Sequence, residues 1–255
     1  MVVEPSHPLI SIRGLELSPR ARLSWARMPI SELHVVRVFV GEDGEHGNPL
    51  GVFLHGASVP EGDRQAIAHD LGFAETVFVD HAARGELRIF TPNMELPLAG
   101  HPLVGTSWLL ARQGLGVSTL RPPAGEVATW SEDGVTWIRG RPEWSPPFEL
   151  RELASAAEVD AHPIPGPESM FEVWAWADRD SGRVRARVFP GEAGIDEDEA
   201  TGSAAMMLVA ELGRPITIEQ GRGSLIRARP GPNGTAEVGG RSEHVSAEHY
   251  EWRSG

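Results

Sequence analysis

The first half of the chain contains short segments in which apolar residues alternate with polar ones or form runs, each ended by turn-forming residues. A helix is predicted over residues 60–71, where Gly72 is a stop signal, and a second from about residue 101 to 113. The predicted strands of this half are residues 33–40, 50–54, 75–79 and 86–90. A loop rich in Pro and Gly, residues 91–100, precedes the second helix.

The second half repeats this order of elements. A turn-rich loop over residues 190–202 precedes a helix over about 203–212. The predicted strands are residues 127–130, 135–138, 172–177, 184–189, 216–218, 225–228 and 236–238. The two halves therefore match in the order and spacing of their elements, while their sequence identity is low.

Two helical segments, residues 103–111 and 204–210, are apolar nearly all round. A helix without a polar face is surrounded by other elements. Two such helices among short strands predict an α+β fold of two similar domains, each a β-barrel-like curled sheet around a central helix. The alternative is a pair of ordinary buried helices.

The regular pattern begins at Ser31, which sets the expected domain bounds. Residues 1–30 are predicted to be a poorly ordered extension. The first domain is expected over residues 31–116 and the second over residues 117–247. A tail is expected over residues 248–255.

Composition removes several classes of chemistry. The 255 residues include no cysteine and no lysine, and a net charge of −13 argues against a nucleic-acid surface. Thiolate nucleophiles and a pyridoxal phosphate Schiff base are therefore impossible. No stretch is apolar for long enough to span a membrane, and the absence of cysteine is compatible with a reducing cytoplasm, where we expect the protein.

Both apolar helices begin with glycine, at Gly100-His101 and at Gly202-Ser203. A helix start offers unpaired amides and a partial positive charge, so two facing starts would hold a small carboxylate. The alternative is simple capping of the second helix by Thr201 or Ser203.

Three titratable residues are candidates for acid–base work. Asp198 belongs to an acidic run, residues 196–199, which is either a solvated turn or a loop with this one side chain turned inward. Glu75 either begins an exposed strand or points into an apolar cleft, where desolvation would raise its pKa. His101 is either a cap residue or an acid–base partner.

The remaining patterns give weaker indications of function. The histidines are scattered, no metal motif is found, and we expect neither a metal nor a cofactor. Residues 220–224, with Arg222 among glycines, either face an anionic ligand or form a tight hairpin.

Taken together, these segments resemble the phenazine-biosynthesis PhzF-like family. The resemblance covers roughly residues 33–240, and its most specific element is the segment from Glu197 to Ala204. The other matching pieces are Phe39, Gly47-Asn48-Pro49, residues 75–79, Phe90-Thr91-Pro92, residues 95–102, Gln220-Gly221 and Val238-Gly239-Gly240.

The resemblance implies a diaminopimelate-epimerase-like fold with the site in the cleft between two domains. It also implies a glutamate general acid/base, Glu75, assisted by His101, Asp198 and Ser203. The expected substrate-binding residues are Gly100, Gly202, Thr201, Asn48 and Gly221. The chain departs from the family at Glu199, where proline is usual, at Ala99, where many members have cysteine, and at Ala74, where serine is frequent.

The expected function is a cofactor-independent isomerase that transfers a proton within a small carboxylate-bearing metabolite. Two alternatives are a lyase that uses the same base for β-elimination and a non-catalytic binding protein that kept the anion pocket. A homodimer is a further expectation, with neither a nucleic acid nor a membrane as partner.

Overall fold

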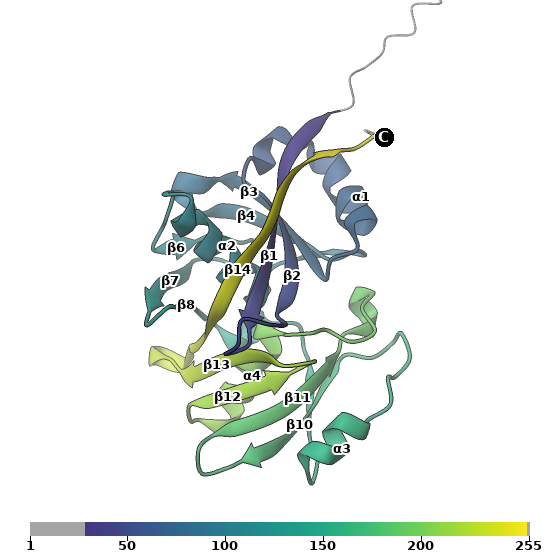
Figure 1. Ribbon diagram of the computed structural model, residues 1–255, viewed down its shortest axis with the longest axis vertical. Helices are drawn as coiled ribbons and strands as arrows, with labels where there is room; N and C mark the ends of the chain where they lie inside the picture. Colours follow the sequence, from purple (N-terminus) through teal and green to yellow (C-terminus); the bar gives the residue numbers. More distant parts are fainter. Residues whose placement is uncertain (1–28, 254–255) are drawn as a thin grey trace, which may run out of the picture.

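The computed structural model describes residues 29–253, in which strands and helices follow one another as the sequence pattern predicts for most elements (Figure 1). The helices are α1 (Glu61–Leu71), α2 (Gly100–Arg112), α3 (Ala156–Ala161) and α4 (Gly202–Leu212), with 3-10 turns at Gly56–Ser58, Ala82–Arg84, Pro142–Trp144, Gly191–Ala193 and Pro232–Gly234. The strands are β1 (Ile30–Val40), β2 (Asn48–Phe53), β3 (Glu75–His81), β4 (Glu86–Phe90), β5 (Glu95–Leu96), β6 (Thr119–Leu120), β7 (Val127–Glu132), β8 (Val135–Gly140), β9 (Glu149–Glu152), β10 (Phe171–Asp178), β11 (Arg183–Phe189), β12 (Ile216–Gln220), β13 (Ser224–Pro230) and β14 (Ala236–Glu251).

One mixed sheet runs through the described residues. Its strand order is β5-β4-β3-β2-β1-β14-β13-β12-β11-β10-β9, and β8 joins β14 while β7 and β6 extend from β8. Most neighbours are antiparallel, but β2–β3, β9–β10 and β11–β12 are parallel. The sheet curls around helices and ends at open strands within the described part of the chain, so it is α+β and not a closed barrel.

The two apolar helices lie at the centres of the two ends of the molecule (Figure 1). In α2 every residue from Gly100 to Ser107 is buried, and α4 is buried over most of its length. Figure 1 shows β1–β4 and β6–β8 with α2 in the upper part of the molecule and β10–β13 with α4 in the lower part. Helix α2 contacts β1, β2, β3, β7, β8 and β14, and α4 contacts β13 and β14. The prediction of a curled sheet around each of two central helices is therefore confirmed.

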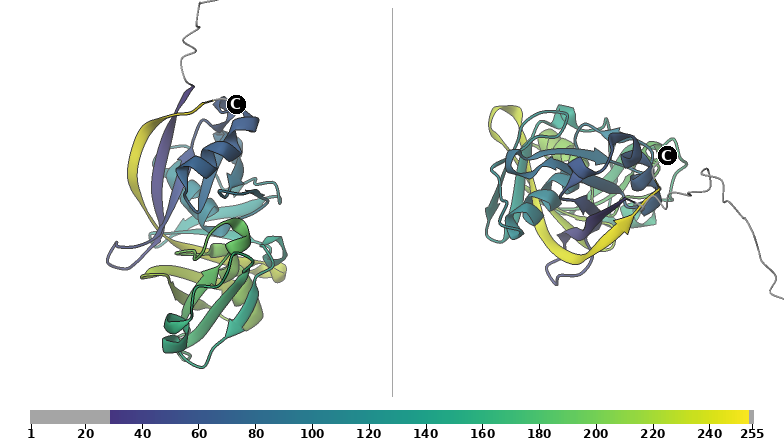
Figure 2. Two further views of the ribbon diagram at one scale, coloured as in Figure 1. Left: turned by 90° about the vertical axis from the view of Figure 1, so that its right-hand side faces the viewer. Right: turned by 90° about the horizontal axis from the view of Figure 1, so that it is seen from above.

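The last strand, β14, holds the two ends together. It pairs with β1 from Arg241 to Glu251 and with β8 and β13 nearer its start. Figure 2 shows it running along the outside of the molecule beside β1. The tail expected after residue 247 is therefore wrong as far as Glu251, because backbone pairing with β1 orders these polar residues.

Strands β7 and β8 follow residue 116, the expected end of the first domain, but they pack against α2. We propose that the chain forms two domains and that β7 and β8 belong to the first domain. The expected extension lies almost entirely outside the described residues, although Ile30 already belongs to β1.

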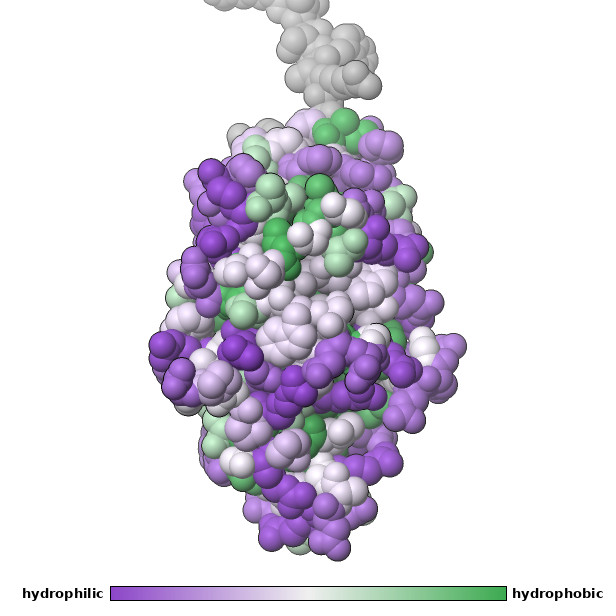
Figure 3. Space-filling view, turned by 90° about the vertical axis from the view of Figure 1, so that its left-hand side faces the viewer, coloured by the Kyte–Doolittle hydropathy of each residue, from purple (hydrophilic) through white to green (hydrophobic). Residues whose placement is uncertain are grey.

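One face of the molecule exposes both hydrophilic and hydrophobic residues. Figure 3 shows hydrophilic residues over much of this face, with hydrophobic ones gathered toward its upper part. Among residues 29–253, no helix has the length and apolar character needed to cross a bilayer.

Candidate active site

The starts of α2 and α4 meet at two glycines. A Cβ atom added to Gly100 would lie 2.5 Å from the carbonyl carbon of Gly202, and one added to Gly202 would lie 2.8 Å from the Cα of Gly100. Only glycine allows two backbones to approach so closely. Thr201, the N-cap of α4, makes no side-chain capping hydrogen bond, so the simple capping alternative is not what the structure shows for this residue. Two helix N-termini with their amides therefore lie side by side.

Glu75 is the first residue of β3 and is buried, with 7% of its surface exposed. The parallel pairing of β3 with β2 sets Glu75 opposite Leu50. Its Oε2 atom lies 3.3 Å from Nδ1 of His101 and makes no hydrogen bond of good geometry with any described residue. Burial, and second the nearby charge of Asp198, raise the pKa of Glu75 well above its usual value.

His101 follows Gly100 in the first turn of α2 and is also buried. Its Nδ1 atom lies 3.3 Å from Nδ2 of Asn48, while no described residue hydrogen-bonds its Nε2 atom. Burial lowers the pKa of His101 to about 3, so the ring is neutral near pH 7.

Asp198 is turned inward from the acidic run. Its Oδ1 accepts a 2.6 Å hydrogen bond from Nδ2 of Asn48, and its Oδ2 accepts one of 2.6 Å from the hydroxyl of Thr201. Its own amide donates to the carbonyl of Val188 at 3.0 Å. Burial raises the pKa of Asp198 to about 6, although the bonds from Thr201 and Asn48 act in the opposite direction.

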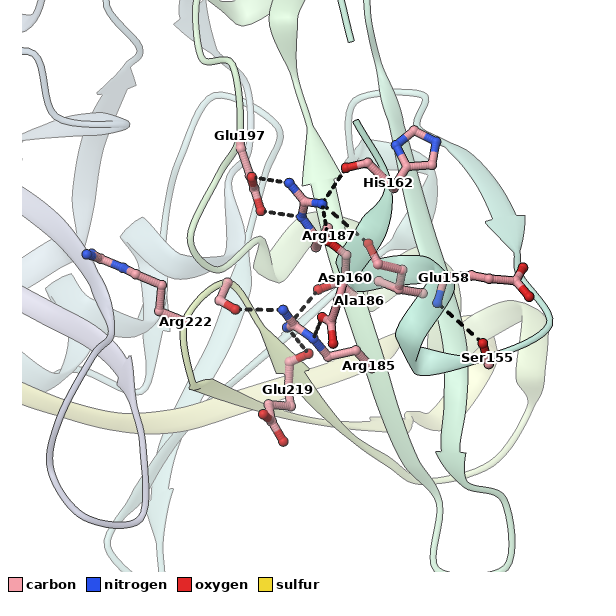
Figure 4. Close-up of polar contacts among 12 residues, drawn as sticks. Ser155, Glu158, Asp160, His162, Arg185, Ala186, Arg187, Glu197, Glu219 and Arg222 are labelled. Atoms are coloured by element: carbon pink, nitrogen blue, oxygen red, sulfur yellow. Dashed lines mark hydrogen bonds and ion pairs between the residues drawn. The ribbon is translucent and has the colours of Figure 1, made fainter. Parts of the chain in front are cut away.

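The neighbour of Asp198 on the N-terminal side points outward. Figure 4 shows Glu197 in a two-bond ion pair with Arg187 of β11, at 2.7 and 2.6 Å. The same guanidinium donates to the carbonyls of Val159, Asp160 and His162 at the end of α3. Arg187 therefore anchors the acidic loop on the sheet, which fixes where the backbone of Asp198 lies.

The sequence interpretation missed the role of Gln220, the last residue of β12. Its Nε2 donates to the carbonyl of Asp198 at 2.8 Å and to the hydroxyl of Thr201 at 2.9 Å. Its Oε1 accepts a 3.1 Å bond from the amide of Thr201. Gln220-Gly221 was among the pieces that match the family, but that match assigned no role to the side chain of Gln220. Residues 220–224 form the tight hairpin that was one of the two interpretations.

The remaining expected residues lie around this cluster. Ser203 is buried in the first turn of α4, and its carbonyl accepts a 3.2 Å bond from the hydroxyl of Ser145. Gly221 lies in the hairpin, where a Cβ atom would be 2.4 Å from Oε2 of Glu199. In the described part of the chain, no group of three or more His, Asp or Glu side chains is arranged to hold a metal ion.

The fold is α+β, and buried titratable side chains gather beside the two helix starts, an arrangement found in enzymes that transfer protons. The chain belongs to the phenazine biosynthesis-like family: the PhzC-PhzF family model matches residues 36–168. It is 30% identical over 224 residues to the trans-2,3-dihydro-3-hydroxyanthranilate isomerase of Pseudomonas fluorescens, which covers 69% of this chain and 78% of that protein. The enzyme of the same name from Pseudomonas chlororaphis is 32% identical over 219 residues, with the same coverage.

Solved structures show the same fold. A phenazine biosynthesis protein of the PhzF family from Bacillus anthracis aligns with a TM-score of 0.72 and 17% identity, covering 88% of this chain and 99% of that one. A hydroxyproline epimerase from Agrobacterium vitis aligns with a TM-score of 0.56 and 11% identity, covering 89% and 93%. These structures confirm the fold that the sequence resemblance implied, and the family model and the Pseudomonas relatives confirm the family.

Proposed function

We propose that this isomerase moves a proton within a small carboxylate-bearing metabolite by general acid/base catalysis, without a cofactor. One observation carries the proposal. Glu75 is a buried carboxyl group with a raised pKa, and one of its oxygens lies beside His101 without a well-aligned hydrogen bond. A base of this kind is suited to removing a proton from carbon near neutral pH.

The proposed reaction needs no oxidant or reductant, because the electrons stay within the substrate. Glu75 in its ionised form takes a proton from one carbon, and the electrons of that C–H bond move into an adjoining π system. The proton returns to a different carbon, so substrate and product have the same atoms. His101 presents Nε2 and Asp198 presents a carboxyl group with a pKa of about 6 as the other proton-handling groups.

The helix starts provide the proposed binding site for the substrate carboxylate. Amides in the first turns of α2 and α4, next to Gly100 and Gly202, lie close together, and the two partial positive charges add. Thr201 and Asn48 are proposed to hold Asp198 in place, and Ser203 to contact the substrate. Gly221 is proposed to lie near the substrate through the same hairpin as Gln220.

The test uses the substrate named by the relatives, trans-2,3-dihydro-3-hydroxyanthranilate, together with a panel of small unsaturated carboxylates, in heavy water. An isomerase gives a product of unchanged formula that gains at most one deuterium, and dialysis of the protein against EDTA leaves the rate unchanged. A β-elimination would lower the product mass, and stabilisation without turnover would indicate a binding protein. Either result, or a rate that only an added metal restores, would overturn the proposal.

A further inference from the structure

Glu199, the other neighbour of Asp198, points away from the acid–base cluster and toward the turn between β12 and β13. Its Oε1 atom accepts a 3.0 Å hydrogen bond from the amide of Arg222 and a 2.8 Å bond from the hydroxyl of Ser224. Only 17% of the Glu199 side chain is exposed. This carboxylate is therefore held by the hairpin and not by solvent.

Ser224 extends the contact to the other half of the chain. It is fully buried, and its hydroxyl oxygen accepts a 3.0 Å bond from the amide of Gly47. Gly47 precedes Asn48, whose side-chain amide donates to Asp198. The path from Asp198 thus returns to Asp198 through two peptide links and three hydrogen bonds. We call Asp198, Glu199, Ser224, Gly47 and Asn48 the closed ring.

The backbone leaves this ring little freedom. Gly47 has a φ of 90°, and a Cβ atom there would lie 2.8 Å from Cγ1 of Val40 and 3.1 Å from the carbonyl of Val38. Gly221 has a φ of 59° and lies directly against the carboxylate of Glu199. Both positions require glycine, so the turns that carry the ring are fixed in shape.

We infer that Glu199 is a positioning residue: through Ser224 and Gly47 it holds the amide of Asn48 on the carboxyl group of Asp198. The ring crosses between the segment before β2 and the elements around α4, so it also holds the two sides of the candidate active site together. Its catalytic consequence rests on the proposed function, whereas its effect on the ionisation of Asp198 does not.

Glu199 acts on Asp198 in two opposed ways. Its negative charge disfavours ionisation of its neighbour and so raises the pKa of Asp198. The ring keeps the Asn48 amide on Oδ1, and a hydrogen bond to the charged form lowers the same pKa. If Glu199 had only a structural role, removing its charge and opening the ring would not shift the pKa of Asp198 in opposite directions.

Two variants separate them. Glu199→Gln keeps an oxygen acceptor for Ser224 but loses the charge, so Asp198 should titrate at a lower pH than in the wild type, by up to about one pH unit. Ser224→Ala keeps the charge but opens the ring, so Asp198 should titrate at a higher pH. The titration is followed by carbon NMR of the side-chain carboxyl groups in the full-length protein, with Asp198→Asn to assign the signal.

Glu219→Gln is the control, because Glu219 lies on β12 beside the hairpin but outside the ring and is about half exposed. It should leave the titration of Asp198 unchanged. If Ser224→Ala does not fold, Ser224→Cys keeps a similar size with weaker hydrogen bonds and is interpreted in the same way.

Shifts of opposite sign in the two variants support the inference, and any other pattern overturns it. The NMR titration needs no substrate, so its result does not depend on the result of the isomerase assay. Once a substrate is converted, the pH–rate profile should move in the same two directions.

Discussion

Oε2 of Glu75 and Nδ1 of His101 lie 3.3 Å apart, and both side chains are shielded from water. Burial favours the neutral form of each group, by raising the pKa of Glu75 and lowering that of His101. A neutral carboxyl group at this position can donate a hydrogen bond to Nδ1 of the neutral ring. The ring then carries its own proton on Nε2, the atom for which no described residue is a hydrogen-bond partner.

The first prediction concerns Glu75. Glu75→Gln keeps shape and hydrogen bonding but removes the base, so the rate should fall by about 10²–10⁴-fold while substrate binding largely survives. Steady-state kinetics and a binding titration measure the two quantities. Glu248→Gln, at an exposed position of β14, is the control. Wild-type turnover in Glu75→Gln would reject the mechanism and make Asp198 or His101 the candidate base.

The second prediction concerns the contact between the helix starts. Gly100→Ala places a methyl group 2.5 Å from the backbone of Gly202, so α2 and α4 must separate. We expect a loss of activity and a lower melting temperature. Gly62→Ala in α1 has nothing within 4 Å of the added atom, and it should stabilise the protein by about 0.5–1 kcal/mol. Equal effects of the two substitutions would contradict this interpretation.

The third prediction concerns a buried carboxyl group outside the site. Glu172 of β10 is 1% exposed, and burial, followed by the charge of Glu211, raises its pKa to about 8. The unfolded chain ionises this group near its ordinary pKa of 4.5, whereas the folded protein does not until about 8. The wild type should therefore lose stability as the pH rises through this window.

Glu172→Gln removes this loss. Its free energy of unfolding should exceed that of the wild type by a few kcal/mol at about pH 8, and the difference should shrink toward about pH 4. Urea unfolding across the pH range gives both curves. Parallel curves would mean that Glu172 does not titrate abnormally.

The fourth prediction concerns metals. Since residues 29–253 hold no cluster of ligands arranged for a metal ion, dialysis against EDTA should leave the melting temperature unchanged. Elemental analysis of the purified protein checks the same point. Tightly bound zinc in a one-to-one ratio would contradict it.

Strong local patterns predicted the elements that place the site. The apolar run before Gly213 gave α4 within one residue, and the apolar segment after Glu75 gave the start of β3. The local sequence predicted an element less well where its length depends on pairing with a distant segment. The strand predicted over residues 236–238 is the beginning of β14, which continues to Glu251 because β1 lies beside it.

Short elements were also missed. Strand β9 has four residues and helix α3 has six, too few to show a clear period. Within the site, neither the inward direction of Asp198 nor the contacts of Gln220 follow from local spacing. They depend on Arg187, Asn48 and the hairpin, which the fold brings together from separate parts of the chain.

The pairing of the first and last strands has a consequence for how the chain is made. Ile30 lies opposite Glu251 in the sheet, so the part around α2 includes a strand, β14, that is synthesised after every other described element. This end of the molecule cannot complete its sheet before β14 has been synthesised. The part around α4 is finished earlier in the chain, apart from the start of β14. We expect the part around α2 to acquire its native stability only after β14 has emerged from the ribosome and paired with β1.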